Sequence, residues 1–315
     1  MAENKAFLLL LFLFCIVFRK SEFYASEYRM YDGADSVILL LDDEYNNPLP
    51  QNFRTCTDSL KSSDVIPDIT GLSSLRVSGS AQFWEKNLSV MKDVIGAQNI
   101  TIVDLRQESH GFVNGMPVSW YGKYDWANLG MTGDEVILDE RQRLDSLLRK
   151  GSITISEKTQ KNKSTGEITG KKYLIVEVET VSEERETAEK YGFSYFRIAV
   201  TDHRSPGLKD VNRFVEFVRG LPEDAWLHFH CHAGDGRTTT FMAMYDMMRN
   251  AKKAELKDIL QRQYLLGGID LSKDDDFPEY DRQYAIERTE FLGKFYLYCK
   301  SNSDNYKTGY SEHEK

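Results

Sequence analysis

A buried strand, a glycine-containing loop and a helix follow one another at residues 226–248, and this unit constrains the fold more than any other part of the chain. Residues 226–230 (WLHFH) have the apolar pattern of a short strand, and residues 238–248 carry apolar side chains at helical spacing. Between them, residues 230–238 read HCHAGDGRT. A loop that joins a strand to the amino end of a helix directs unpaired backbone N–H groups at one point, which favours a bound anion. The sequence therefore predicts a phosphate site in an α/β fold.

The loop also carries a nucleophile and a cation at its two ends. Beside an arginine, at the amino end of a helix, the thiol of Cys231 is expected to ionise more readily than that of a free cysteine. Arg237 has a planar fork of donors that suits two oxygens of a phosphoryl group, and Thr238 is expected to bind the sulfur as it leaves. His230 is expected to hold the shape of the loop through its ring N–H. The residues between them that are expected to contact the substrate are His232, Ala233, Gly234, Asp235 and Gly236.

A phosphate monoester also needs a proton donor, because an alkoxide is a poor leaving group. Residues 195–200 form a strand pattern that runs into the turn-forming segment 201–207 (TDHRSPG), and a helix pattern follows. Asp202 is thus predicted on a loop one β-α unit before Cys231, from which a carboxylic acid can reach the ester oxygen. The alternative for Asp202 is a turn or helix-cap role.

The pattern His-Cys-x5-Arg-Thr, with an aspartate on an upstream Thr-Asp-His loop, resembles the protein-tyrosine-phosphatase-like inositol phosphatases, the bacterial cysteine phytases. Other segments resemble the family in the same order, namely residues 52–55, 103–112, 118–122, 125–128, 196–199, 226–230 and 256–260. The resemblance implies hydrolysis of inositol hexakisphosphate and lower inositol polyphosphates through a phosphocysteine, with no metal or other cofactor. It also implies a small β-barrel-like insert beside a phosphatase-type domain. We expect that domain to hold a mostly parallel central sheet of about four or five strands with helices on both sides.

The same resemblance implies residues that contact the substrate outside the loop. Arg54, Asp125 and His203 match positions that contact substrate in the family. Lys161 and Lys163 lie at the tip of a predicted hairpin, where the family also brings basic residues. The alternatives are a surface salt bridge for Arg54, a loop anchor for Asp125 and a solvated face for the two lysines.

Acidic residues depart from the family at two places. Residues 273–281 read KDDDFPEYD where relatives carry lysines near the pocket, and Asp235 adds a carboxylate inside the loop. Like charges repel a polyanionic substrate at close range, which leaves the affinity for the hexakisphosphate and the order of attack open. Asp235 has the alternative role of capping the loop by accepting backbone N–H bonds.

Three alternating histidines suggest a different chemistry, that of a metal-dependent hydrolase. His228, His230 and His232 alternate and would face one way on a strand, as in a zinc or di-metal hydrolase. The chain has six histidines and no HExxH motif, and a metal would leave Arg237 without a task. Among phosphatases, a protein tyrosine or dual-specificity enzyme is the alternative. A phosphate-binding module without catalysis is a further class. The charged residues at the end of the predicted strand 100–105, namely Asp104, Arg106, Glu108 and His110, are expected to form a structural ion-pair network.

Length and composition set the domain organisation. The 315 residues suffice for one large domain with an insert, and the net charge of −9 argues against nucleic acid as a partner. We predict a cysteine phosphatase domain at residues 26–315, with the small β subdomain inserted around residues 151–182. Cys56, Cys231 and Cys299 do not form a disulfide scaffold. Residues 301–315 are polar enough for a frayed tail.

The first 25 residues are predicted to be a signal peptide or an amino-terminal anchor. Residues 6–18 form an apolar run that is too short to span a bilayer comfortably. Cleavage near residue 25 would give an exported protein, in the periplasm, secreted or at the cell surface, without stable membrane association.

Overall fold

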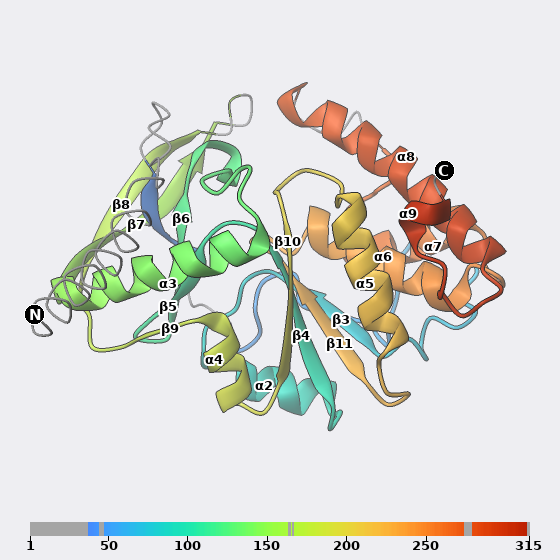
Figure 1. The fold of residues 1–315 in the computed structure, drawn as a ribbon, viewed down its shortest axis with the longest axis horizontal. Helices are drawn as coiled ribbons and strands as arrows, with labels where there is room; N and C mark the ends of the chain where they lie inside the picture. Colours follow the sequence, from blue (N-terminus) through green and yellow to red (C-terminus); the bar gives the residue numbers. More distant parts are fainter. Residues whose placement is uncertain (1–36, 44–46, 163–164, 166, 274–278, 314–315) are drawn as a thin grey trace, which may run out of the picture. The chain divides into compact units, whose positions relative to one another are not determined.

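The computed structural model describes residues 37–43, 47–162, 165, 167–273 and 279–313. Figure 1 shows its helices and strands. The strands are β1 (Ile38–Leu41), β2 (Arg54–Thr55), β3 (Val77–Ser80), β4 (Ile100–Arg106), β5 (His110–Val113), β6 (Met116–Tyr121), β7 (Ser152–Lys161), β8 (Ile168–Glu177), β9 (Val181–Ser182), β10 (Ser194–Val200) and β11 (Trp226–His230). The helices are α2 (Asn87–Ile95), η1 (Lys123–Asp125), α3 (Gly133–Lys150), α4 (Glu184–Lys190), α5 (Leu208–Arg219), α6 (Gly236–Asn250), α7 (Leu256–Leu265), α8 (Glu279–Ser301) and α9 (Tyr310–His313).

The central sheet has five strands in the order β10-β4-β11-β3-β2. The first four are parallel, and the short edge strand β2 runs antiparallel to β3. The prediction of a mostly parallel sheet in an α/β fold is therefore confirmed. Because the carboxyl ends of parallel strands meet at one edge, the segments that follow β4, β10 and β11 come together there. These segments carry Glu108, Asp202 and Cys231.

The two faces of this sheet differ because side chains alternate along each strand. Leu227 and Phe229 of β11 pack in a core with side chains of α5, α6, α7 and α8. The residues between them, His228 and His230, face the other way, where Phe53 and Phe83 contact their rings. The apolar side chains of this core thus cover one face of the sheet, whereas the other face buries polar groups such as His228 and His230.

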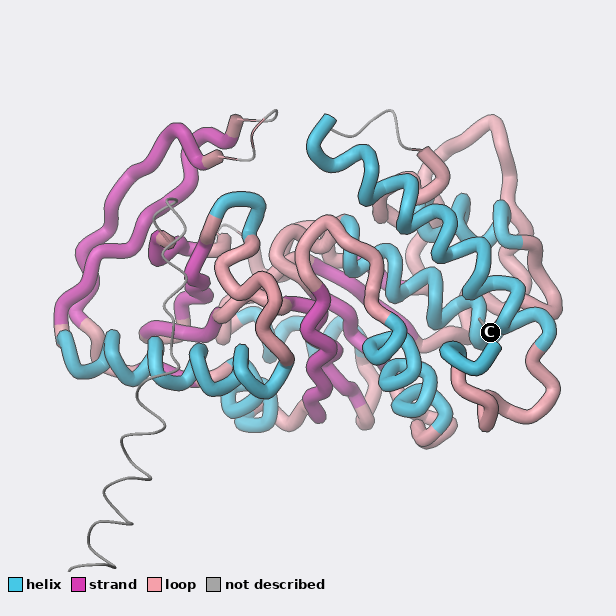
Figure 2. The backbone as a smooth tube through the Cα atoms, turned by 45° about the horizontal axis from the view of Figure 1, so that its top comes forward, coloured by secondary structure: helices cyan, strands magenta, loops and turns pink. Residues whose placement is uncertain are grey.

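The predicted hairpin is present as β7 and β8, which pair antiparallel from Ser152 opposite Glu177. It belongs to a six-stranded sheet of order β8-β7-β1-β6-β5-β9 (Figure 2). Strand β7 pairs in parallel with β1, and β5 and β6 complete the middle of the sheet. The β subdomain therefore takes residues 38–41 and 110–121 besides the segment 151–182, because the free edge of a hairpin needs a further strand to satisfy its backbone groups.

The prediction of a frayed carboxyl-terminal tail is wrong for residues 302–313. Helix α9 returns to the core, and Tyr310 is only 1% exposed, packed against Phe291, Phe295 and Tyr298. The hydroxyl of Tyr306 donates a hydrogen bond of 2.7 Å to the backbone oxygen of Met248. One buried and one half-buried tyrosine thus outweigh the polar composition of the segment.

The predicted signal peptide or anchor lies outside the described residues. Within the described ranges, no helix is both long enough and apolar enough to span a membrane.

Candidate active site

The thiol of Cys231 lies directly beyond β11 and is 3% exposed. The hydroxyl of Thr238, in the first turn of α6, donates a hydrogen bond of 3.2 Å to the sulfur. Helix α6 begins at Gly236, so its unpaired amides and the positive end of its dipole lie at the loop. The structure thus brings together the predicted nucleophile, the predicted hydroxyl partner and a helix amino terminus.

The loop packs closely against the segment after β3 and can do so only with a glycine at position 234. Gly234 has a φ of +76°, and a Cβ at this position would lie 2.4 Å from the backbone nitrogen of Ala81. The backbone oxygens of the two residues before Gly234 also accept hydrogen bonds. Gln82 N–H donates to the oxygen of His232 at 3.0 Å, and the Asn52 side-chain amide donates to that of Ala233 at 2.9 Å.

Replacing Gly234 by alanine is expected to lower the rate of phosphate release by about 10²-fold or more, because the loop must move away from Ala81 and misplaces the groups that hold the phosphate. The control is Gly151→Ala. Gly151 has a φ of +74° and no atom within 4 Å of the added Cβ, so it carries the same backbone strain without the clash. Phosphate release and thermal unfolding are measured for both variants. Activity of Gly234→Ala within threefold of the wild type would contradict this account of the loop.

The guanidinium of Arg237 is held on two sides. Its Nη1 and Nη2 donate to the two carboxylate oxygens of Glu108 at 2.7 and 2.9 Å, and Nη1 also donates to the backbone oxygen of Val200 at 3.1 Å. Its Nε lies 3.0 Å from Oδ1 of Asp202. Arg237 is 3% exposed. Glu108 therefore orients the guanidinium plane that is to bind the phosphate, a role that the sequence pattern did not reveal.

Asp202 lies between two cations. Its Oδ1 faces Arg237, and its Oδ2 lies 3.3 Å from Nε2 of His203. Burial would raise the pKa of Asp202, but the charges of Arg237 and His203 outweigh burial and hold the pKa below its ordinary value. The cap of α5 is Gly207, so Asp202 does not have the alternative cap role. The predicted general acid is in place beside the loop, and the neighbouring cations favour its ionised form.

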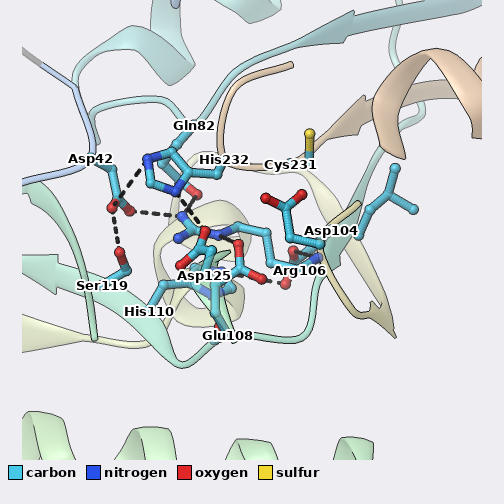
Figure 3. Close-up of polar contacts among 12 residues, drawn as sticks. Asp42, Gln82, Asp104, Arg106, Glu108, His110, Ser119, Asp125, Cys231 and His232 are labelled. Atoms are coloured by element: carbon cyan, nitrogen blue, oxygen red, sulfur yellow. Dashed lines mark hydrogen bonds and ion pairs between the residues drawn. The ribbon is translucent and has the colours of Figure 1, made fainter. Parts of the chain in front are cut away.

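A buried network extends from Glu108 to the β subdomain (Figure 3). Arg106 donates to Glu108 and Asp42 at 2.7 Å and to Gln82 at 2.6 Å. Asp42 in turn accepts a 2.5 Å hydrogen bond from Ser119 of β6. The predicted ion-pair network is therefore present, and it supports Arg237 through Glu108. Asp42, Gln82 and Ser119 had no local signal in the sequence, because each is an ordinary polar residue until the fold brings it to Arg106.

A second buried cluster lies beneath β11. Arg197 lies 2.9 Å from both Asp104 and Glu140, and Nε2 of His230 lies 2.6 Å from Glu184. The predicted contact of the His230 ring with the loop is therefore replaced by a contact with α4, because alternation along β11 turns this side chain to the face opposite the thiol. His230 supports the loop from below, as part of an ionic cluster.

His110 in this cluster makes the stability of the fold depend on pH. Burial and Arg106 oppose its protonation, but Asp104 and Glu140 outweigh them and raise the pKa of His110 from 6.5 to about 10. The stabilisation from its charge is fully present below pH 6.5 and is lost as the pH rises to about 10, so the free energy of unfolding should fall over this range. Denaturant unfolding at several pH values measures the slope.

His110→Gln is expected to reduce that slope. His313→Gln, at an exposed position of α9, is the matched control and should keep it. An unchanged slope in His110→Gln would show that other groups cause it.

Arg54 is buried, at 2% exposure, beside the amino end of α6. Its Nη1 and Nη2 donate to the backbone oxygen of Asn52 and to the hydroxyl of Thr239. Among the described residues no carboxylate forms an ion pair with it, so the salt-bridge alternative is not supported. Burial lowers the pKa of Arg54 to about 10, and the side chain senses the charges of Cys231 and Asp235. Within the described residues it is therefore a buried cation with no ion pair at salt-bridge distance, next to the phosphate loop.

Asp125 and Asp235, two of the predicted substrate contacts, each contact another side chain near the loop. Asp125 is 3% exposed, and its Oδ2 lies 2.8 Å from Nδ1 of His232, which supports the loop-anchor alternative. The side chain of Asp235 accepts a hydrogen bond of 3.2 Å from Asn52 and caps no backbone N–H of α6, so the capping alternative is wrong. The backbone of Asp235 at the first turn points its carboxylate toward Asn52 instead.

The remaining predicted contacts lie at the rim of the site. His203 has a φ of +67° and pairs through Nδ1 with Asp281 at 2.9 Å. Lys161, at the end of β7, is exposed, and its charge acts on His203. Lys163 and residues 274–278 of the acidic segment lie outside the described residues.

The three alternating histidines do not share a site. His228 bonds to Ser78 and Ser80, and burial lowers its pKa well below the ordinary value. Within the described part of the chain, His230 and His232 each lie near a different pair of carboxylates. His230 lies near Asp104 and Glu184, and His232 lies near Glu108 and Asp125. In each set a carboxylate is already paired with an arginine. This donor arrangement does not favour the zinc alternative, since arginines and a cation would compete for the same oxygens.

Comparison with known proteins gives relatives over most of the chain. The family model described as PTP-like phytase, inositol hexakisphosphate, matches residues 103–249. A PTP-like phytase from Bdellovibrio bacteriovorus is 33% identical, with a TM-score of 0.67, over 88% of this chain and 94% of that one. The PTP-like myo-inositol phosphatase from Mitsuokella multacida is 38% identical, with a TM-score of 0.80, over 88% of this chain and 47% of that one. The effector protein hopD2 of Pseudomonas syringae pv. tomato is 31% identical over 79% of this chain and 53% of its own.

The chain thus spans about half the length of the Mitsuokella and Pseudomonas relatives and nearly the whole of the Bdellovibrio one. The match covers the loop with Cys231 and Arg237 as well as both sheets. From this agreement in sequence and fold, the chain belongs to the PTP-like phytase family.

Proposed function

We propose that this protein hydrolyses phosphate monoesters of inositol hexakisphosphate and of lower inositol polyphosphates through a phosphocysteine, without a metal ion. The observation that carries the proposal is the arrangement of Cys231, Thr238 and Arg237 around one helix amino terminus, with Asp202 on the guanidinium. The relative from Mitsuokella multacida was solved with myo-inositol-(1,3,4,5)-tetrakisphosphate, which supports this class of substrate.

The reaction has two steps. In the first, the thiolate of Cys231 attacks phosphorus, the S–P bond forms, and the bond to the inositol oxygen breaks as Asp202 donates a proton to that oxygen. Arg237 and the loop amides hold the equatorial oxygens as their charge changes. In the second step, water attacks the phosphocysteine, Asp202 takes a proton from the water, and Thr238 donates its hydrogen bond to the leaving sulfur. Each step uses a residue whose place in the site is described above.

A polyanionic substrate needs local cations, because the chain as a whole is acidic, with a net charge of −9. Arg54 is buried beside the loop without a carboxylate partner in the described residues, and Lys161 extends toward His203 from the hairpin. The two come from different sheets and would contact phosphates other than the one that is cleaved. The substrate would therefore be held by its neighbouring phosphates while one of them lies on the loop.

The experiment compares phosphate release from inositol hexakisphosphate and from a phosphotyrosine peptide, both with a chelator present. We expect chelator-resistant release from the inositol ester, with a kcat/KM well above that for the peptide. Preference for the peptide would favour the protein tyrosine or dual-specificity alternative. Loss of activity with chelator, restored by metal, would overturn the metal-independent mechanism.

Export is also proposed. The apolar run at residues 6–18 supports it, and one relative bears the name of an effector protein. Expression of the full chain in a bacterial host, followed by mass measurement of the protein from the periplasm and the medium, tests it. A mature protein that begins near residue 26 is expected, and an intact chain found only in the cytoplasm would contradict export.

A further inference from the structure

A carboxylate of α8 reaches the general acid through a histidine. Oδ2 of Asp281 lies 2.9 Å from Nδ1 of His203, and Nε2 of the same ring lies 3.3 Å from Oδ2 of Asp202. The other oxygen of Asp202 lies 3.0 Å from Nε of Arg237. Asp281 is 4% exposed, and no step of the mechanism above uses it. The four side chains therefore form a continuous series of contacts from α8 to the guanidinium of Arg237.

The ring of His203 is held in a defined orientation. A carboxylate beside Nδ1 accepts a hydrogen bond from the N–H of that nitrogen, and this orientation of the ring directs Nε2 at Asp202. The positive φ of +67° at His203 is unusual for a non-glycine residue. Both ring nitrogens thus have an acidic partner at hydrogen-bond or ion-pair distance.

Several charges act on the two titrating groups. His203 faces Asp202 on its own loop, Asp281 on α8 and Lys161 on β7. Burial and Lys161 lower the pKa of His203, but the two carboxylates outweigh them and raise it. The cations that face Asp202 are Arg237, His203, His232 and Arg288. The carboxylates that face it are Glu108, Asp125 and Asp235. The charges therefore favour the proton of the pair on His203, with Asp202 ionised.

We propose that His203 supplies the proton that Asp202 gives to the leaving group, and that Asp281 is the positioning residue that keeps this proton available. The proposal rests on the proposed function. When a phosphate dianion binds, it takes the place of Asp202 at Nε of Arg237 and surrounds Asp202 with negative charge. The proton on Nε2 of His203 then passes to Oδ2 of Asp202 and from there to the ester oxygen. The ring, charged before this transfer, is then neutral, and its remaining N–H at Nδ1 still donates a hydrogen bond to Asp281.

The second step returns the proton. Asp202 takes a proton from the attacking water and passes it to Nε2 of His203, so the pair ends the cycle as it began. The proton count of ionised Asp202 with charged His203 equals that of protonated Asp202 with neutral His203. The loss of activity at high pH therefore reports the loss of one proton from Asp202 and His203 together. The pH at which it occurs follows the proton affinity of His203, which Asp281 raises.

Asp281→Asn is the test variant, because asparagine keeps the shape and removes the charge. We expect the alkaline limb of kcat/KM to move to lower pH by about one unit, as for the loss of one close opposite charge. The substrates are phenyl phosphate, whose leaving group needs a proton, and 4-nitrophenyl phosphate, which leaves without one. The shift and the rate loss should be larger for phenyl phosphate. Glu287→Gln, at an exposed position on α8, is the matched control and should show neither.

A second readout does not depend on turnover. The imidazole of His203 is titrated by nuclear magnetic resonance in Cys231→Ser and in Cys231→Ser with Asp281→Asn, where the pKa should fall in the second protein. A lower rate of Asp281→Asn at every pH with an unmoved limb, or an unmoved His203 titration, would overturn the relay and leave Asp281 as packing. Wild-type protein that hydrolyses neither these esters nor inositol hexakisphosphate would overturn the proposed function instead, and the titration would still decide whether Asp281 controls His203.

Discussion

Replacing Cys231 by serine is expected to lower phosphate release by roughly 10⁵-fold or more, the largest effect of any single substitution in this chain. A serine hydroxyl is not ionised near neutral pH, and the hydrogen bond that the described residues make to the sulfur comes from the Thr238 hydroxyl, which is not a base. The loop amides and Arg237 would remain, so inositol hexakisphosphate should still bind. Phosphate release measures the first effect and titration calorimetry the second.

The matched control is Cys299→Ser, a cysteine-to-serine change at a buried position of α8. It should keep the wild-type rate per folded molecule. If Cys231→Ser retained more than a thousandth of the activity, the nucleophile would have to be another group, and the phosphocysteine mechanism would be wrong.

Glu108→Ala is expected to have the second largest effect, because it removes the shared partner of two buried guanidinium groups. Glu108 binds Arg237 through both oxygens and Arg106 through one of them, and all three side chains are almost inaccessible to solvent. Removing one partner of a buried ion pair destabilises a protein by about 3–5 kcal/mol, since an uncompensated charge stays inside. Arg237 would also lose its orientation, so phosphate release should fall by about 10²-fold or more per folded molecule.

Denaturant unfolding measures the stability of this variant, and phosphate release at a temperature where it is folded measures its activity. Glu216→Ala, at an exposed position of α5, is the control and should change neither by much. Glu108→Gln separates the two effects, because it keeps the shape and removes the charge. A stable and fully active Glu108→Ala would mean that Arg237 is positioned by Val200 and the loop alone.

Local sequence determined the chemistry of the loop. The strand at residues 226–230, the glycine at 234 and the helix from residue 236 are consecutive, and their structure follows from hydrophobic period and backbone preference. Cys231 and Thr238 could be paired from the spacing, since a loop of this length returns the first turn of the helix to the end of the strand. Asp202 could be placed beside them from the βαβ order alone.

Local sequence also predicted the elements of the second sheet, but not its extent. The hairpin of residues 152–177 was predicted from its pattern, whereas the parallel partner β1 lies more than a hundred residues earlier. Four apolar residues form that strand, and so short a run does not reveal its pairing with β7 and β6. The same limit hid the return of α9, because the aromatic residues that bury Tyr310 come from α8.

The tertiary structure alone decided what each charged side chain faces. Asp42, Gln82, Glu108 and Asp281 are separated by tens to hundreds of residues and meet at Arg106, Arg237 and His203. Asp125 was expected to contact the substrate from its resemblance to the family and Asp235 from its place in the loop, and only the structure shows that one contacts His232 and the other Asn52. The physical reason is range. Periodicity and turn preference act over a few residues along the chain, whereas the partner and the proton affinity of a buried charge depend on every group within a few ångströms in space.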